Sequence, residues 1–113
     1  MMASISPLNE FKTLTHDLTT NSEVVYTTDI AINTIILHGQ IANTTNDQFV
    51  KITAIHTRGA KDTYIVRDFE IPPNDVLIFI EGKVVFEEED SLKVFADRDN
   101  CAELVLSYLE TSA

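Results

Sequence analysis

The side chains most often used in catalysis stand singly in this sequence. None of the three histidines has a second histidine or a cysteine two or four residues away, which is the spacing that usually marks a zinc site; they are His16, His38 and His56. The chain holds only three glycines and no Gly-x-Ser-x-Gly turn that would present a serine nucleophile. We therefore expect histidines that are solvated or hydrogen-bonded and no nucleophilic triad.

The single cysteine has acidic neighbours in the sequence. Cys101 is flanked by Asp97, Asp99 and Glu103, and negative charges disfavour the reactive thiolate form of a cysteine. One cysteine also cannot build an intramolecular disulfide framework. We expect Cys101 to be chemically inert.

Two acidic segments could in principle bind a cation. Residues 87–90 read Glu-Glu-Glu-Asp, a run that usually marks a solvated turn. Asp97-x-Asp99 begins like a calcium loop, but positions six and twelve of that loop are Ala102 and Tyr108 instead of glycine and glutamate. We predict a solvated turn at residues 87–90 and no metal or other cofactor.

Composition and charge limit the classes of partner. The chain has 113 residues and a formal net charge of −10. Proteins that bind nucleic acids or anionic membranes normally carry the opposite charge, so both partners are disfavoured. The longest apolar run, residues 76–80, is far shorter than a membrane span, and no secretory signal is visible. We expect one soluble acidic domain that folds in a reducing compartment.

Short segments rich in Val, Ile, Thr, Tyr and Phe recur between turn clusters, which is typical of all-β folds. The sequence predicts a single antiparallel β-sandwich, of jelly-roll or immunoglobulin-like type, with seven or eight strands over residues 11–113. Residues 1–10 are expected to be a short N-terminal arm. The candidate segments for these strands, of which the first is the weakest, are residues 11–18, 23–28, 30–42, 49–57, 63–69, 76–80, 83–86, 92–96 and 103–110.

Several details of these strands are expected from local patterns. Residues 76–80 are uniformly apolar, as in a strand that is buried on both faces. Glu81 and Gly82 are expected to form a turn, and the strand at residues 30–42 is expected to break at Gly39. A helix over residues 102–109 is the weaker alternative to a strand. The predicted core comprises Val50, Ile52, Val66, Ile78, Ile80, Val94 and Leu106.

The order of several motifs is informative. An Asn-Thr-Thr turn at residues 43–45 ends a strand, and Ile-Pro-Pro at residues 71–73, Gly-Lys-Val-Val-Phe at 82–86, Asp-Ser-Leu-Lys-Val at 90–94 and Ser-Tyr-Leu-Glu at 107–110 follow. This order resembles a group of small β-sandwich virion proteins of tailed bacteriophages. Those proteins carry Pro-x-Gly and Gly-Asp turns where this chain has Asn74 and Glu89. Glutamate tolerates the left-handed backbone poorly, so the turn at Glu89 is expected to take another shape.

The resemblance implies a structural role in a particle. The first hypothesis is a non-enzymatic virion protein, assembled in the cytoplasm of the host bacterium, that docks on capsid, neck or tail proteins in several copies. Homo-oligomers are expected, and the resemblance alone suggests a trimer. Extended segments can order along a neighbouring protein, so the expected interaction residues are those of the arm: Met1, Met2, Ala3, Ser4, Ile5, Ser6, Pro7 and Leu8.

Two rival classes of protein are also compatible with the sequence. The chain could be a receptor- or carbohydrate-binding module on a phage fibre or tail, although it lacks tryptophan, which is suited to sugar stacking. An enzyme would require His38, His56 and a carboxylate to meet in one pocket.

Overall fold

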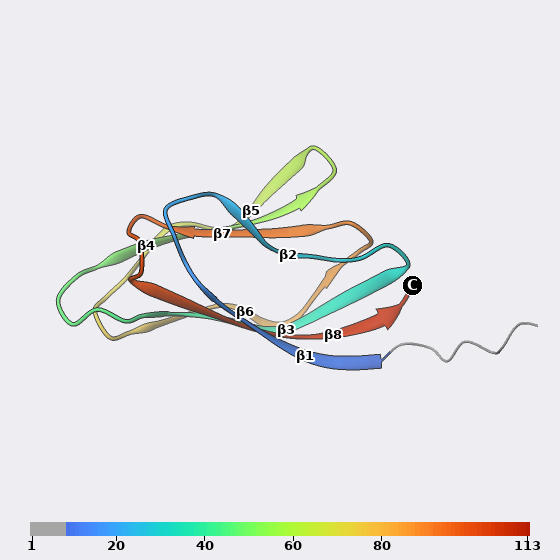
Figure 1. Cartoon of the computed structure of the whole chain (residues 1–113), viewed down its shortest axis with the longest axis horizontal. Coiled ribbons are helices and arrows are strands. Elements are labelled where there is room, and N and C mark those ends of the chain that lie inside the picture. Colours follow the sequence, from blue (N-terminus) through green and yellow to red (C-terminus); the bar gives the residue numbers. More distant parts are fainter. Residues whose placement is uncertain (1–8) are drawn as a thin grey trace, which may run out of the picture.

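A computed structural model describes residues 9–113, which form eight strands in two four-stranded antiparallel sheets (Figure 1). Sheet A has the strand order β1-β8-β3-β6, and sheet B has the order β2-β7-β4-β5. This is the strand order of an eight-stranded jelly roll. The predicted β-sandwich is therefore confirmed, and it is of the jelly-roll type and not of the immunoglobulin-like type. The strands are β1 (Asn9–Asp17), β2 (Glu23–Thr27), β3 (Ile32–Asn43), β4 (Val50–Arg58), β5 (Lys61–Ile71), β6 (Val76–Phe86), β7 (Ser91–Ala96) and β8 (Ala102–Ser112).

The core lies between the two sheets and follows the period-two pattern of the strands. On β7, Leu92, Val94 and Ala96 are buried and the residues between them are partly exposed. On β8, Leu104 and Leu106 point inward in the same way, so the strand at this position is confirmed over the helix. Alternation of this kind places one face of each strand against the opposite sheet.

Most of the predicted core residues are buried. Five of the seven have almost no exposed surface: Val50, Ile52, Ile80, Val94 and Leu106. Val66 is half-buried and packs against the edge of this cluster. The prediction for Ile78 is wrong, because 49% of its surface is exposed.

The exposure of Ile78 corrects the interpretation of residues 76–80. These residues belong to β6, an edge strand of sheet A, and residues 76–79 alternate between the two faces of the sheet. Leu77 and Phe79 pack against the core, whereas Val76 and Ile78 face away from it. The segment is therefore apolar on both faces although only one face is buried.

The expected turn at Glu81 and Gly82 is also wrong. β6 continues through both residues, and its pairing with β3 shifts where Ile36 faces Val84 and His38 faces Glu81. This shift is a β-bulge, and Gly82 supplies the positive φ of 96° at that point. A glycine with positive φ serves a bulge as well as a turn, which explains the wrong prediction.

The expected break at Gly39 does not occur either, because β3 runs through that residue. A Cβ atom at Gly39 would lie 2.9 Å from the ring of Phe79 and 3.3 Å from a methyl group of Leu106. Gly39 therefore gives the Phe79 ring room to lie against the sheet.

The N-terminal boundary differs from the prediction by two residues. β1 begins at Asn9 and pairs with β8 without interruption, so Asn9 and Glu10 belong to the sheet and not to the arm. The expected arm residues 1–8 lie outside the described part of the chain, and their role stays a prediction.

Two turns contain a residue other than glycine with a left-handed backbone. Asn74 has a φ of 58° and Glu89 a φ of 66°, both in the left-handed region and both at positions where the phage proteins carry glycine. The expectation that Glu89 would change the shape of its turn is therefore wrong. Glu89 adopts the backbone shape for which glycine is better suited, at an energetic cost.

Candidate functional site

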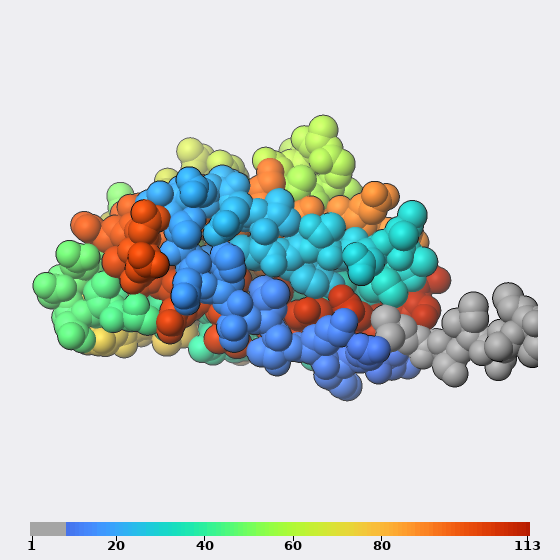
Figure 2. Space-filling view, in the orientation of Figure 1, coloured from blue at the N-terminus to red at the C-terminus, as the bar shows by residue number. Residues whose placement is uncertain are grey.

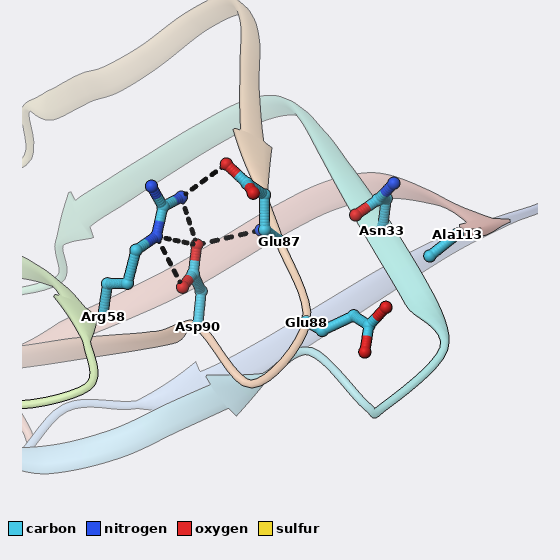
Figure 3. A pocket seen from close by; sticks show the side chains of 6 residues that line it. All are labelled: Asn33, Arg58, Glu87, Glu88, Asp90 and Ala113. Atoms are coloured by element: carbon cyan, nitrogen blue, oxygen red, sulfur yellow. Dashed lines mark hydrogen bonds and ion pairs between the residues drawn. The ribbon is translucent and has the colours of Figure 1, made fainter.

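One polar cluster surrounds the turn between β6 and β7 (Figure 3). The Arg58 guanidinium donates to both carboxylate oxygens of Asp90, at 2.9 Å from Nε and 2.7 Å from Nη2. His56 Nε2 lies 3.0 Å from Oδ2 of Asp90, and the backbone N–H of Glu87 donates to the same oxygen. Arg58 also pairs with the Glu87 carboxylate at 3.0 Å.

These contacts correct the prediction of a fully solvated acidic turn. Glu87, Glu88 and Glu89 are exposed, but Asp90 is buried and closes the turn from inside. The hydrogen bonds from Arg58, helped by His56, hold the pKa of Asp90 well below its usual range. Asp90 is therefore a permanently charged structural group at neutral pH.

A hollow of about 310 Å³ lies beside this turn. Its lining combines Arg58 and Asp90 with three further polar residues and a chain end: Asn33, Arg58, Glu87, Glu88, Asp90 and Ala113 (Figure 3). Its one cation, Arg58, is already paired with two carboxylates, and its lining has no aromatic ring on which a sugar could stack. The hollow therefore offers little to a ligand.

A second polar cluster lies between the sheets. Tyr26 donates to Glu110 Oε2 at 2.6 Å and lies 2.6 Å from the Thr34 hydroxyl, which Thr28 contacts at 3.1 Å. The single phenol proton of Tyr26 is donated to Glu110, so the Thr34 hydroxyl must donate to Tyr26. The hydrogen bonds therefore run in one direction, from Thr28 through Thr34 and Tyr26 to Glu110. Lys12 completes it by donating to the other oxygen of Glu110 at 2.7 Å.

This second cluster ties three strands of sheet A to β2 of sheet B. Burial favours the neutral form of Glu110, but the hydrogen bonds from Lys12 and Tyr26 outweigh burial and lower its pKa. Burial and the bond to Glu110 raise the pKa of Tyr26. Every polar group in the cluster has a partner, so the cluster orients the two sheets and leaves no free group for chemistry.

The remaining candidate residues lie apart from one another. His16 contacts Glu23 at 2.8 Å, and His38 contacts Gln40 at 3.0 Å. His38 is on the outer face of sheet A, whereas His56 faces the interior beside Phe86. The Cys101 thiol donates to the backbone oxygen of Asp99. Among residues 9–113 no three His, Cys, Asp or Glu side chains are placed to hold a metal ion.

The two aspartates of the rejected calcium loop stabilise turns instead. Oδ1 of Asp97 accepts from the backbone N–H of Lys51 at 2.8 Å. Oδ1 of Asp99 accepts from the backbone N–H of Thr20, also at 2.8 Å. The Asp97 carboxylate thus ties the turn between β7 and β8 to the start of β4, and the Asp99 carboxylate ties it to the loop between β1 and β2.

The most distinctive surface is the outer face of sheet A, which sequence reasoning missed. One cross-strand row on this face is apolar on all four strands. We call it the outer apolar row, and it consists of Phe11, Leu109, Ile35 and Val85 in spatial order. Phe11 is 77% exposed and Val85 51% exposed, while Leu109 and Ile35 are partly exposed.

The rest of the outer face of sheet A is mixed. Val76 and Ile78 add exposed apolar surface on β6. Between them and the outer apolar row lies a polar row with one residue from each strand: Thr13, Ser107, His38 and Glu81. The solvent-facing side of an antiparallel sheet is usually polar, so an apolar row across the full width of a sheet is typical of a binding face. The feature of the sequence that indicates this face is that apolar residues occupy both alternating sets of positions on β6.

The protein was also compared with known proteins. No family model and no curated protein matches the chain. A solved structure with a similar fold comes from the Bacillus endospore appendages, described as a novel family of disulfide-linked pili; its TM-score is 0.55 at 8% sequence identity. The match covers 99% of this chain and 97% of that one, so the likeness extends over the whole sandwich. Residues 9–113 contain no helix long and apolar enough to cross a membrane.

Proposed function

We propose that this protein is a non-enzymatic structural protein of a bacteriophage virion, which docks in several copies on capsid, neck or tail proteins through the outer face of sheet A. The observation that carries the proposal is the outer apolar row, with exposed Phe11 and Val85 at its two ends. Burying exposed apolar side chains against a partner contributes about 25 cal/mol for each Å² removed from water.

Two further observations support an assembly role. The left-handed turns at Asn74 and Glu89 agree with the turn pattern of the phage proteins that the sequence resembles. The similar chain in the Bacillus appendages is described as belonging to pili, so a sandwich of this shape is compatible with a multi-subunit assembly. Within each of the two polar clusters, centred on Asp90 and Glu110, the polar groups are paired with one another. This pairing favours a structural role over catalysis.

The proposal is tested in purified particles of the phage that encodes the chain. Quantitative mass spectrometry should find the protein in a fixed number of copies per particle. Its presence in infected cells but not in particles would contradict the proposal.

Point variants then test the docking face. Ile78→Asp, on the outer face of sheet A, should reduce incorporation at least about tenfold, because an unpaired buried charge strongly opposes association. Val24→Asp is a matched control, because Val24 on β2 is also 49% exposed but belongs to sheet B. Equal incorporation of both variants would show that docking does not use this face.

The carbohydrate-binding alternative predicts a different result. A module on a fibre would bind immobilised glycans in an array at fixed ionic strength, and the loops would carry the binding. Specific glycan binding that Ile78→Asp leaves unchanged would favour that alternative.

A further inference from the structure

A sandwich of two open sheets has four edge strands, and these edges differ in how they are protected. Edge strands expose unpaired N–H and C=O groups that can pair with another chain, and proteins usually block them with bulges, charges or short length. In this fold the edges are β1 and β6 of sheet A and β2 and β5 of sheet B.

Three of the edges carry such protection. β6 is interrupted at two register shifts against β3, and β2 is five residues long with a shift between Val24 and Tyr26. β5 has two shifts against β4, a left-handed residue at Asp68, and several charged side chains. None of these three edges offers a long regular template for another strand.

β1 is neither short nor bulged, although it carries the charged residues Glu10, Lys12 and Asp17. All nine of its residues pair one-to-one with β8, without a bulge, a glycine or a proline. Its side chains are largely exposed, and it lies open at the front surface in Figure 2. A regular, open edge strand is suited to pairing with a strand of another molecule.

We propose that β1 pairs antiparallel with β1 of a second copy of this chain, around a two-fold axis at Phe11, so that the two A sheets join into one eight-stranded sheet. In an antiparallel pair of strands, two residues that lie directly opposite each other point to the same side of the sheet. A two-fold axis between two residues would pair side chains from opposite sides, so the axis must pass through one residue of β1. The choice among the possible centres follows from the side chains that each centre brings together.

An axis at Phe11 gives the best set of cross-strand pairs. It places Phe11 beside the partner's Phe11 and Glu10 beside the partner's Lys12, and aromatic pairs and opposite charges both stabilise neighbouring strands. An axis at Lys12 would put two ammonium groups opposite each other. An axis at Thr13 would put Lys12 opposite the partner's Leu14. Of these three centres, only the axis at Phe11 places opposite charges beside each other and also brings the two aromatic rings together.

The pairing also extends the outer apolar row. Phe11 is the β1 end of that row, so the two rows would meet at the axis and run across all eight strands. This inference does not rest on the virion role, because the pair is expected to form from the isolated chain.

The first test is the mass of the purified full-length chain in solution. Sedimentation equilibrium should show a concentration-dependent species of twice the chain mass of 12.7 kDa. Phe11→Asp should weaken association at least about tenfold, because it places two carboxylates opposite each other. Val85→Asp is the matched control: it puts the same charge at the far end of the same row and should leave association within about twofold.

The outcomes of this test are decisive. A monomer at all accessible concentrations, or a trimer, would overturn the proposal, as would equal weakening by both variants, which would indicate face-to-face packing. Circular dichroism checks that both variants remain folded. A monomeric chain that still enters particles would overturn the pair and leave the proposed function standing.

The second test measures the register. In a Cys101→Ser chain, the double variant Asn9→Cys/Thr13→Cys should oxidise to a covalent dimer, because an axis at Phe11 places each of these residues opposite the other in the partner. Within one chain the two positions are about 13 Å apart along the strand, too far for a disulfide. Thr13→Cys alone should stay uncrosslinked. Rapid crosslinking of that single variant would place the axis at Thr13 and overturn the proposed register.

Discussion

Phe11 on β1 and Val85 on β6 stand at opposite ends of one apolar row that crosses the outer face of sheet A. Leu109 and Ile35 lie between them, each directly opposite its neighbours in the sheet. The row joins the two edge strands of the sheet, which are 74 residues apart in the sequence. The proposed docking would bury this continuous apolar strip against a partner and would leave the two buried polar clusters undisturbed.

The assigned core makes a first prediction. Ile52→Ala and Leu106→Ala each remove a fully buried side chain and should each lower the free energy of unfolding by about 2–5 kcal/mol. Ile78→Ala removes a half-exposed side chain on the outer face and should cost less than about 1 kcal/mol in the isolated chain. Urea unfolding followed by circular dichroism measures all three. A loss at Ile78 as large as that at Ile52 would show that the outer face of sheet A is covered within one molecule.

The buried carboxylate of Asp90 predicts a dependence of stability on pH. Its pKa is lower in the folded chain than in the unfolded chain, so the charged form stabilises the fold at neutral pH. That contribution should be lost progressively as the pH falls below about 4, the ordinary value for aspartate.

The variant Asp90→Asn isolates this effect. It should lower the free energy of unfolding at pH 7 by about 1–3 kcal/mol, the range for a lost hydrogen bond to a charged group. The difference between the two proteins should shrink as the pH is lowered from 5 towards 3. A difference that stays constant over this range would mean that Asp90 is not held in its charged form by Arg58 and His56.

The hydroxyl of Tyr26 is the link between the two ends of the inter-sheet chain of hydrogen bonds. Tyr26→Phe removes the donor to Glu110 and the acceptor for Thr34, and should lower the free energy of unfolding by about 1–3 kcal/mol. Tyr108→Phe is the control, because Tyr108 is similarly buried and its ring packs against that of Tyr26. The Tyr108 hydroxyl does not take part in this series of hydrogen bonds. Equal losses in thermal or urea unfolding would assign the effect to ring packing.

The arm that the sequence predicts at residues 1–8 can be tested by deletion. Removing these residues should leave the melting temperature nearly unchanged and should weaken incorporation into particles, because an arm that orders on a neighbour contributes only in the assembly. Removing residues 1–17 should unfold the chain, since β1 pairs along its whole length with β8. Normal incorporation of the shorter deletion would show that docking runs through the sheet face alone.

Local patterns in the sequence were enough to predict the sandwich and most of its core. Alternation on β7 and β8 identified their inward residues because the period-two rule depends only on neighbours in the chain. The same rule misplaced Ile78, because the local pattern does not distinguish an apolar side chain in the core from one that is exposed on the outer face of a sheet. Glu81 and Gly82 were misassigned because a bulge and a turn both use a glycine with positive φ.

The interior polar clusters could not be predicted for a different reason. Asp90 closes an acidic run that reads as solvated, and its partners Arg58 and His56 come from a strand more than thirty residues away. Only the topology brings them together. The outer apolar row has the same origin, since its four residues come from four strands whose register no local pattern reveals.

The most direct measurement of the proposed docking face is the reactivity of a cysteine placed at Val85. In a Cys101→Ser chain, Val85→Cys should react readily with a maleimide in the isolated protein and at least about tenfold more slowly in purified particles, where the partner covers it. Val24→Cys, equally open in the isolated chain but on sheet B, should react at the same rate in both. Equal rates for Val85→Cys in the free chain and in the particle would contradict docking through the outer face of sheet A.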